Sequence, residues 1–257
     1  MKIAVLVKQV PDTWGERELD PSGRLVRTGV ELVLDEIDER AVEVALQAKD
    51  ESDADVIVIS MGSDPSLDVI RKALAMGADS GILVSDPELA NSDLTWTARV
   101  LAATIRQAGV DLVIAGNEST DGNGGVLAAM IAELLGQPHL TYLDTVRITT
   151  STVSGERGGD AGITTATAAL PAVISVTERV AEPRFASFRG IMKAKKKPVS
   201  ELSLTDLHIS KAELDSANHS VVISAERAPT RDAGVKIVDD GTAGNQLADF
   251  IASQGLG

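Results

Sequence analysis

The sequence predicts an α/β fold in which helices cover both faces of a parallel sheet. Short apolar runs alternate along the first half of the chain with longer segments that carry one apolar stripe. Strands buried on both faces have such runs, and helices that cover a sheet have such stripes. A polar, glycine-rich loop at residues 116–125 joins one run to one stripe, which indicates a site for an anion or a nucleotide.

The composition limits both the core and the partners of the chain. With 257 residues and 44% hydrophobic content a full core can form, and with only 2% aromatic residues it must consist of Val, Ile, Leu and Ala. The net charge of −14 argues against nucleic acid, whose binding needs clustered positive charge. The lack of cysteine excludes disulfides and thiolate chemistry and suits the reducing cytoplasm, where we expect the protein to act.

We expect no membrane segment, no metal site and no catalytic residue. Residues 1–12 become polar too early for a signal peptide, and no apolar run approaches the ~18 residues of a spanning helix. His139, His208 and His219 lie far apart, without the spacing of metal ligands. No Ser–His–Asp or Cys–His combination supports hydrolysis or group transfer.

The apolar pattern places the elements of the first half. Buried strands are expected at residues 2–7, 54–61, 80–84 and 111–115, and helices near residues 37–48, 65–76, 94–108 and 126–135. Asp64 and Asp93 are expected to cap the second and third helices, with Pro65 in the first turn of the second. Gly77 and Gly136 should end the second and fourth helices.

Four loops should converge at one edge of the sheet, because ligands in such folds lie beyond the carboxyl ends of the strands. They are residues 8–12, the loop before Ile37, residues 60–64 and residues 116–125. This convergence favours a nucleotide site over the alternative, an ordinary glycine-rich turn. The loop lacks a Walker lysine and G-x-G-x-x-G spacing, and Gly124 is expected to need a positive φ.

The pattern changes in the second half. Residues 145–153 and 162–169 predict a β-hairpin around a turn at residues 154–161, and residues 171–176 predict another buried strand. A last helix is expected at residues 245–253. We expect an α/β domain at residues 1–198 and an extended C-terminal arm at residues 199–257. The arm should pack on another chain, since its apolar residues would otherwise stay exposed.

A second informative stretch is EPRFASFRGIMKAKKKP, at residues 182–198. Phe185 and Phe188 stand beside Arg184, a composition typical of an interface anchor. The basic run from Lys193 to Lys197 lies in an acidic chain and would steer an acidic partner. The alternatives are a buried loop for the phenylalanines and a solvated helix face for the lysines.

Taken together, these stretches carry a family resemblance over nearly the whole chain. The motifs, in order, are VLVKQVPD (5–12), DEIDERAVEVAL (35–46), DVIRKALAMGAD (68–79), DLVIAGNESTDGNGG (111–125), LPAVISV (170–176) and EPRFASFRGIMKAKKKP (182–198). The chain resembles the β subunit of electron transfer flavoproteins, in the form typical of the actinobacterial branch.

The resemblance implies a fold, cofactors and partners. The fold is a three-layer Rossmann-like sheet of the adenine-nucleotide α-hydrolase-like type. The partner is an α subunit that holds most of a redox-active FAD, while the β subunit covers one side of the flavin and binds a structural AMP. Such a heterodimer carries electrons from acyl-CoA dehydrogenases of fatty acid β-oxidation to a membrane quinone oxidoreductase, without bond-making catalysis by the β subunit.

The resemblance also implies site residues. Mapped onto this sequence, the AMP pocket comprises Leu6, Asp35, Glu36, Ile37, Asp38, Met61, Gly116, Asn117, Glu118, Ser119, Thr120, Asp121, Gly122, Asn123, Gly124, Gly125, Val126 and Leu127. The residues closest to the flavin are Asp12, Thr13 and Trp14. Recognition of the dehydrogenase falls to Arg184, Phe185, Phe188, Lys193 and Lys196, with Phe188 at the anchor position where relatives commonly carry Leu.

Two departures from the family pattern concern the AMP pocket. Asp35, Glu36 and Ile37 stand where relatives often have Asn-Pro-Phe, and Asp35 can accept but not donate an amide hydrogen bond. Gly125 and Val126 stand where Asn-Gln is usual. Backbone contacts to a phosphate survive the second change, whereas side-chain contacts do not.

Three alternatives to this function remain open at the level of sequence. One is an electron-bifurcating member of the family with a second FAD in place of AMP. Another is an independent ATP-binding module or nucleotide hydrolase on the same sheet, with a Mg²⁺ site at Asp64 and Asp121. The third is a subunit that only scaffolds a flavoprotein.

Overall fold

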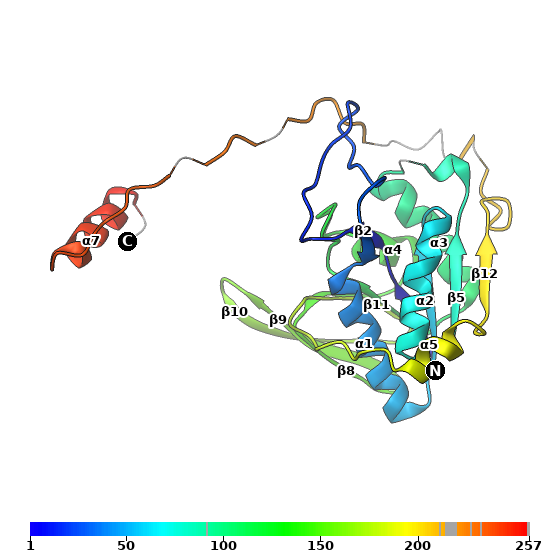
Figure 1. The fold of residues 1–257 in the computed structure, drawn as a ribbon. Coiled ribbons are helices and arrows are strands. Elements are labelled where there is room, and N and C mark those ends of the chain that lie inside the picture. Colours follow the sequence, from blue (N-terminus) through cyan, green and yellow to red (C-terminus); the bar gives the residue numbers. More distant parts are fainter. Residues whose placement is uncertain (91, 211, 214–219, 227, 232, 256–257) are drawn as a thin grey trace. The chain divides into compact units, whose positions relative to one another are not determined.

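A computed structural model describes the chain except for residues 91, 211, 214–219, 227, 232 and 256–257 (Figure 1). The chain divides into two compact units, Met1–Ile223 and Ser224–Gly257. His219, one of the three histidines considered above, lies outside the described residues.

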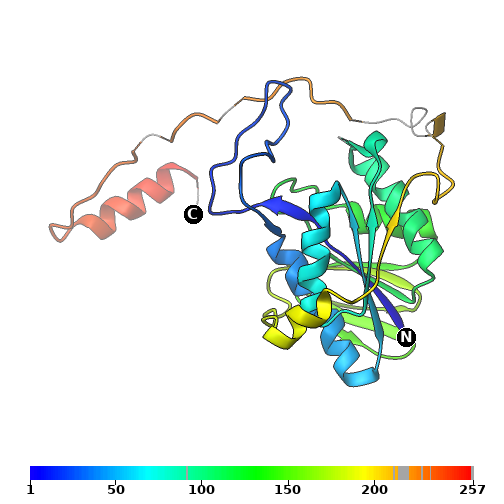
Figure 2. The same ribbon diagram turned by 45° about the vertical axis from the view of Figure 1, so that its right-hand side comes forward.

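The first unit is organised on a parallel sheet (Figures 1 and 2). Its seven strands, counted over the described residues, lie in the order β12-β5-β4-β1-β6-β11-β7, and each pairs in parallel with its neighbours. They are β1 (Lys2–Leu6), β4 (Asp55–Met61), β5 (Ser80–Val84), β6 (Leu112–Gly116), β7 (His139–Leu143), β11 (Ala172–Val176) and β12 (Val199–Leu202). The predicted α/β fold is thus confirmed, and the five strands predicted in this sheet begin and end within one residue of the expected positions.

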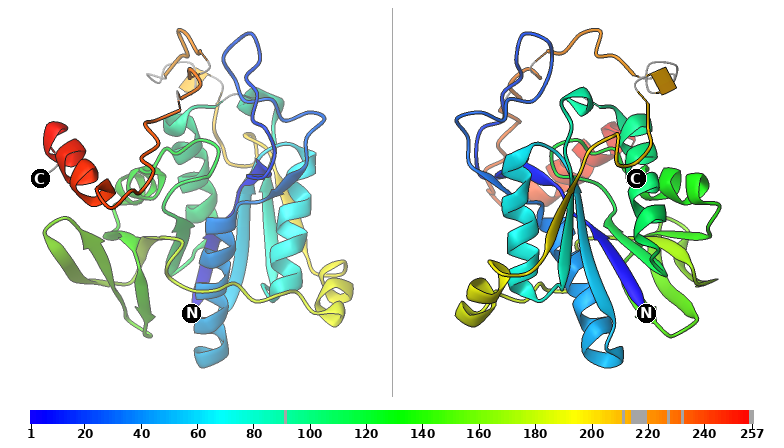
Figure 3. Two further views of the ribbon diagram at one scale, coloured as in Figure 1. Left: turned by 60° about the vertical axis from the view of Figure 1, so that its left-hand side comes forward. Right: turned by 90° about the vertical axis from the view of Figure 1, so that its right-hand side faces the viewer.

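Helices cover both faces of the sheet (Figure 3). On one face lie α1 (Glu36–Ser52) and α2 (Leu67–Met76), and on the other lie α3 (Leu94–Ala108) and α4 (Leu127–Leu135). Side chains along a strand alternate between the faces. In β6, Leu112 and Ile114 pack toward α1 and α2, whereas Val113 and Ala115 pack toward α3 and α4.

Most helix ends follow the predicted capping. Asp93 caps α3, because its Oδ1 accepts a hydrogen bond from the backbone N–H of Trp96 at 2.9 Å. Gly77 and Gly136 end α2 and α4. The prediction for Asp64 is wrong: the residue lies inside a 3₁₀ turn, η1 (Asp64–Ser66), and α2 begins only at Leu67. Pro65 also lies in this turn and not in the first turn of α2, because proline is compatible with the start of the 3₁₀ turn that precedes the helix.

Short strands at the edges were not predicted. β7 and β12 lie at the two edges of the sheet, with the mixed sequences HLTYL and VSEL that partly exposed strands can tolerate. Two more short strands that were not predicted, β2 (Gln9–Pro11) and β3 (Leu32–Leu34), pair antiparallel between β1 and α1. A further short turn, η2 (Pro87–Leu89), precedes α3.

The predicted hairpin is part of a three-stranded antiparallel sheet. Its strands are β8 (Thr145–Ile148), β9 (Thr152–Gly159) and β10 (Gly162–Ala169), in the order β10-β9-β8. The turn expected at residues 154–161 is wrong, because most of that stretch pairs with β10 as strand. Gly155, Gly158 and Gly159 lie within β9, and a Cβ at Gly155 would collide with the Thr145 carbonyl oxygen on β8.

The compact unit continues beyond residue 198, where we expected the arm to begin. β12 pairs with β5, and Leu204 and Leu207 are buried against the same unit. In the second unit the predicted last helix is confirmed as α7 (Ala243–Ser253), none of whose residues is buried. Among the described residues, no helix combines the length and the apolar character needed to cross a bilayer.

Replacement of Ile114 by Ala should lower the free energy of unfolding by about 2–5 kcal/mol, because this fully buried side chain fills the centre of the sheet. Ile163→Ala is the matched control, since Ile163 is 74% exposed, and it should change stability by less than about 0.5 kcal/mol. Urea unfolding of both variants measures the difference. Equal effects would contradict the placement of the core.

Candidate functional site

The strand order creates a switch point between β1 and β6. The chain leaves β1 through α1 toward β4 on one side and returns through α3 to β6 on the other. In open α/β sheets ligands bind at such a point, outside the carboxyl ends of the strands. Residues 8–12, 35–38, 60–65 and 116–126 surround it, and we call this region the mouth.

Hydrogen bonds confirm that the four predicted loops converge. The Lys8 backbone N–H donates to Asp38 Oδ2 at 2.8 Å, which joins the first loop to the start of α1. The Gln9 side-chain amide donates to the Pro65 carbonyl oxygen at 2.9 Å, which joins the first loop to the third. The Gly116 N–H donates to Asp38 Oδ1 at 3.3 Å, which joins the fourth loop to α1.

Asp35 fastens the glycine-rich loop to the N-terminus of α1. Its carboxylate is fully buried and accepts from the Ile37 N–H at 3.0 Å, as a helix cap does. The other oxygen accepts from the N–H and the hydroxyl of Thr120, at 2.7 and 2.8 Å. These are all acceptor roles, so a carboxylate suits this position although relatives often carry an amide there.

Asp38 lies one turn further along α1 and is also buried. Burial raises the pKa of its carboxyl group well above the ordinary value, and the nearby charge of Asp35 adds to the increase. The N–H groups of Lys8 and Gly116 and the charge of Lys8 oppose it. Through its hydrogen bonds with these two N–H groups, Asp38 joins the ends of β1 and β6 at the switch point.

Asp121 is the centre of a charged network on the glycine-rich loop. Its side chain is 1% exposed and receives the Lys8 amine at 2.7 Å, and it also pairs with the Arg27 guanidinium. Burial tends to raise the pKa of Asp121, but the charge and hydrogen bond of Lys8, with help from Ser119 and Arg27, outweigh it and lower the pKa to about 2. Arg17 donates to the Thr120 carbonyl oxygen beside it. Cations therefore gather on this loop although the chain is acidic overall.

The loop backbone requires glycine at one place. Asn123 and Gly125 have positive φ angles of 46° and 65°, but Gly124 does not have a positive φ. The prediction that Gly124 needs a positive φ is therefore wrong. At Gly125 a Cβ would also collide with the Tyr142 hydroxyl, which donates to the Gly125 carbonyl oxygen at 3.0 Å. A Cβ at Gly124 would lie 3.1 Å from the Leu94 side chain.

Two buried oxygen atoms at the mouth have no hydrogen-bond partner among the described residues. They are Ser60 Oγ, near the end of β4, and Asn117 Oδ1, directly after β6. Buried polar atoms are nearly always paired, so a missing partner needs an explanation. Hydrogen-bond donors on a ligand would satisfy both atoms.

The residues assigned to the AMP pocket differ in exposure. Leu6, Asp35, Ile37 and Asp38 are buried; Met61, Gly116, Asn117, Glu118, Ser119, Thr120, Asp121, Gly124, Gly125 and Leu127 are partly buried; Glu36, Gly122, Asn123 and Val126 are exposed. Contacts already described join Asp35, Asp38, Gly116, Thr120 and Asp121. Lys8 and Ser60 lie in loops that the sequence placed at the mouth, although it gave neither residue a role. The sequence did not reveal Arg27 or Tyr142 as members of the mouth, because no motif marks them.

The loop assigned to the flavin begins at the mouth. Asp12 Oδ1 accepts from the Trp14 N–H at 3.0 Å and shapes the turn, while the Trp14 side chain is 96% exposed. Asp12 and Trp14 line a shallow hollow together with Pro11, Gly15, Glu16, Val30 and Glu31. Thr13 is exposed between them.

The residues assigned to partner recognition separate into two groups. Phe185 and Phe188 are 99% and 80% exposed, and Lys193 and Lys196 are exposed on or just after α5 (Phe188–Ala194). Arg184 instead makes contacts inside the chain: its Nε and Nη2 donate to the Glu43 carboxylate at 2.8 and 3.0 Å. Burial tends to raise the pKa of Glu43, but Arg184 outweighs it and lowers the pKa.

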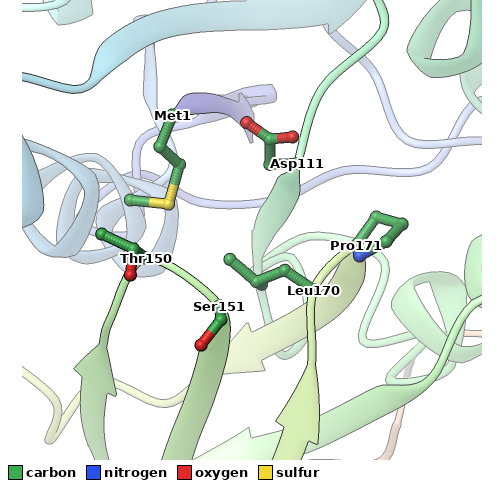
Figure 4. A pocket seen from close by; sticks show the side chains of 6 residues that line it. All are labelled: Met1, Asp111, Thr150, Ser151, Leu170 and Pro171. Atoms are coloured by element: carbon green, nitrogen blue, oxygen red, sulfur yellow. The ribbon is translucent and has the colours of Figure 1, made fainter.

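A larger hollow, of about 440 Å³, lies at the opposite end of the sheet (Figure 4). It is lined by Met1, Asp111, Thr150, Ser151, Leu170 and Pro171, at the amino ends of β1, β6 and β11. Sheets of this class bind ligands at the other end. We therefore keep the mouth as the candidate site.

The fold and the mouth define an α/β protein of the nucleotide-binding class, and comparison with known proteins makes the class specific. The electron transfer flavoprotein domain family matches residues 22–207. The chain is 46% identical to the electron transfer flavoprotein subunits beta of Mycobacterium tuberculosis and Mycobacterium leprae, over 98% of each chain. It is 33% identical to the caffeyl-CoA reductase-Etf complex subunit CarD of Acetobacterium woodii, over 99% of this chain and 97% of that protein.

The chain belongs to the family of electron transfer flavoprotein β subunits. Membership confirms the resemblance drawn from the motifs and implies association with an α subunit and with a flavin.

Asp121→Asn should lower the free energy of unfolding at neutral pH by about 1–3 kcal/mol, because Lys8 and Arg27 lose the negative charge that they share and one of its two acceptor oxygens. A carboxyl group whose folded pKa is depressed stabilises the fold above its unfolded pKa and loses this effect as pH falls. The difference between the parent protein and the variant should therefore shrink between about pH 4 and the folded pKa of about 2. Urea unfolding at several pH values measures it.

Asp160→Asn, at an exposed position between β9 and β10, is the control and should have little effect at any pH. A stability difference for Asp121→Asn that did not vary with pH would contradict the role of its charge.

Proposed function

We propose that the chain is the β subunit of a heterodimeric electron transfer flavoprotein that accepts electrons from acyl-CoA dehydrogenase-type flavoenzymes and delivers them to a membrane quinone oxidoreductase. The α subunit holds most of the FAD, and this chain covers one side of the flavin near Trp14 and binds AMP in the mouth. FAD supplies the one- and two-electron chemistry. The chain itself binds, orients and shields, without a catalytic residue of its own.

The unpaired oxygen atoms of Ser60 and Asn117 are the observation that carries the AMP proposal. An amide oxygen can only accept, and a buried acceptor without a donor is costly. The amino group and the ribose hydroxyls of an adenylate are the donors that this part of the mouth lacks.

The rest of the mouth suits the phosphate of the same ligand. α4 begins at Leu127, and its N-cap residue Val126 supplies no side-chain hydrogen bond, so the first N–H groups need partners from outside the helix. The helix dipole favours an anion at this end. Lys8 and Arg27, whose side chains are 42% and 41% exposed, add positive charge to the loop that precedes α4.

The nucleotide hydrolase is less well supported. Asp121, its proposed metal ligand, is already neutralised by Lys8 and Arg27. In the described part of the chain, no group of three or more His, Cys, Asp or Glu residues could hold a metal ion.

Counting the nucleotides released from the denatured heterodimer separates the remaining candidates. One FAD and one AMP per heterodimer is the expected result. Two FAD without AMP would identify the bifurcating form, and a complex without flavin would leave only a scaffold. Metal-dependent ATP turnover by the isolated chain would favour the hydrolase.

The exposed face of α5 supports contact with the electron donor. Phe185 and Phe188 lie exposed beside the basic residues Arg189, Lys193 and Lys196, in a chain of net charge −14. An aromatic anchor surrounded by charge is typical of a docking site, and the charge selects an acidic partner.

The second unit supports contact with the α subunit. Its apolar side chains Val235, Val238, Leu247, Phe250 and Ile251 are exposed within the described chain. A unit of this size has little core of its own, so we assign these side chains to an interface with the α subunit.

Gly125→Val should reduce the AMP content of the purified heterodimer several-fold, because a β-branched residue is strained at a φ of 65° and its Cβ would collide with Tyr142. Gly109→Val is the control: it has a φ of 62° but open surroundings at the end of α3, away from the mouth. Nucleotide analysis after denaturation measures both. Full AMP content in Gly125→Val would argue against this placement of the phosphate.

Phe188→Ala should raise the KM for an acyl-CoA dehydrogenase about 30-fold at unchanged FAD content, because a desolvated aromatic anchor is typically worth ~2 kcal/mol. The control is Ile163→Ala, which removes an exposed apolar side chain on β10 and should leave the KM unchanged. Steady-state reduction of the heterodimer by the dehydrogenase measures both, and parent-like kinetics for Phe188→Ala would exclude an anchor at this position.

A further inference from the structure

α5 is packed tightly against the C-terminal end of α2 (Figure 2, yellow helix beside the cyan helix). Gly190, in the middle of α5, lies so close to α2 that a Cβ would collide with the Ala75 carbonyl oxygen. Ala194, at the end of α5, is 3% exposed and belongs to the main core. The helix therefore has a fixed inner side.

The ends of the two helices satisfy each other's carbonyl groups. Arg71, on α2, donates through Nη1 to the carbonyl oxygens of Ala194 and Lys197 at 2.7 and 2.8 Å. Lys197, three residues after the end of α5, donates in turn to the carbonyl oxygens of Leu74, at 3.0 Å, and of Ala78, just after the end of α2. The last carbonyl groups of a helix have no hydrogen-bond partner within the helix, so Arg71 and Lys197 supply the missing donors.

The segment before α5 is also fastened. Ser187 caps the helix, because its hydroxyl oxygen accepts from the Gly190 N–H at 3.0 Å. Arg184 pairs with Glu43, which is buried on α1, and with Asp50 at 2.9 Å. α5 is thus held at both ends, by α1 on one side and by α2 on the other.

Among the described residues, the outer side of α5 makes no such contacts, and it carries large apolar side chains. Phe188, Ile191 and Met192 are 80%, 46% and 51% exposed. Lys197, by contrast, points inward, and burial lowers its pKa while the charge of Asp79 opposes the shift. The basic run therefore presents Lys193, Lys195 and Lys196 outward, while Lys197 anchors the segment.

We propose that Arg71 is a positioning residue that holds α5 in its docking conformation before the electron donor arrives. The proposal rests on the docking function assigned to Phe188. Ordering a flexible segment at an interface costs free energy, and a segment already fixed by its own protein avoids that cost. Arg71 touches no reacting group; it fixes the backbone carbonyls at the end of the helix that carries the anchor.

The test compares Arg71→Gln with Arg106→Gln in the FAD-loaded heterodimer. Arg106 makes the same kind of contact on the other face of the sheet, where it donates from α3 to the Leu134 carbonyl oxygen at 2.9 Å. Arg71→Gln should raise the KM for an acyl-CoA dehydrogenase about tenfold, leave kcat and FAD content unchanged, and speed amide hydrogen exchange in residues 188–197. Arg106→Gln should leave the KM and this exchange unchanged.

Two further variants make the outcome decisive. Arg71→Lys retains the positive charge and N–H donors on a side chain of similar reach, whereas the Gln amide is shorter and neutral, so the KM of Arg71→Lys should lie between those of the parent protein and Arg71→Gln. Gly190→Ala should reproduce the defect of Arg71→Gln from the other side of the contact. If hydrogen exchange in residues 188–197 is unchanged in Arg71→Gln, Arg71 does not hold α5 in place. If exchange is faster but the KM is that of the parent protein, Arg71 holds α5 but has no role in docking. If neither Arg71→Gln nor Phe188→Ala raises the KM, the docking function assigned to Phe188 is wrong. If Phe188→Ala raises the KM and Arg71→Gln does not, the docking function stands and only the positioning role of Arg71 is wrong.

Discussion

The mouth depends on two buried carboxylates at the start of α1, those of its N-cap residue Asp35 and of Asp38. Asp38 accepts from residue 116, 78 positions away, and Asp35 accepts from residue 120, 85 positions away, so that one helix start holds the ends of two strands and the glycine-rich loop. Buried carboxylates are tolerated here because backbone N–H groups and the helix dipole compensate them. Together with the contacts of Lys8 with Asp121 and of Tyr142 with Gly125, they fix the glycine-rich loop relative to the sheet.

The sequence revealed the sheet wherever burial was complete. β1, β4, β5, β6 and β11 have apolar neighbours on both faces, and such surroundings permit little except Val, Ile, Leu and Ala. β7 and β12 escaped prediction because an edge strand has a partner on one side only and tolerates His, Thr, Ser and Glu. In β9 the glycines were mistaken for a turn, since close approach of strands and tight turns both call for a residue without a side chain.

The location of the site was predictable, whereas most of its chemistry was not. Parallel topology alone brings the loops after β1, β4 and β6 together, whatever their residues. The charged network is different, because Lys8 and Arg27 meet Asp121 across 113 and 94 positions and no local pattern links them. The requirement for glycine at position 125 also includes the contact with Tyr142, 17 positions away, which only the folded chain contains.

Most of the aromatic side chains lie on the surface and outside the core. All three phenylalanines of the chain, Phe185, Phe188 and Phe250, are exposed, and Trp14 is almost fully so, while the core is aliphatic. Folding and association therefore draw on separate sets of side chains. A lineage could therefore exchange its aromatic surface residues, and with them its redox partners, at little cost to the stability of the sheet. For the same reason, the fluorescence emission of Trp14 would report assembly with another chain more closely than it reports folding.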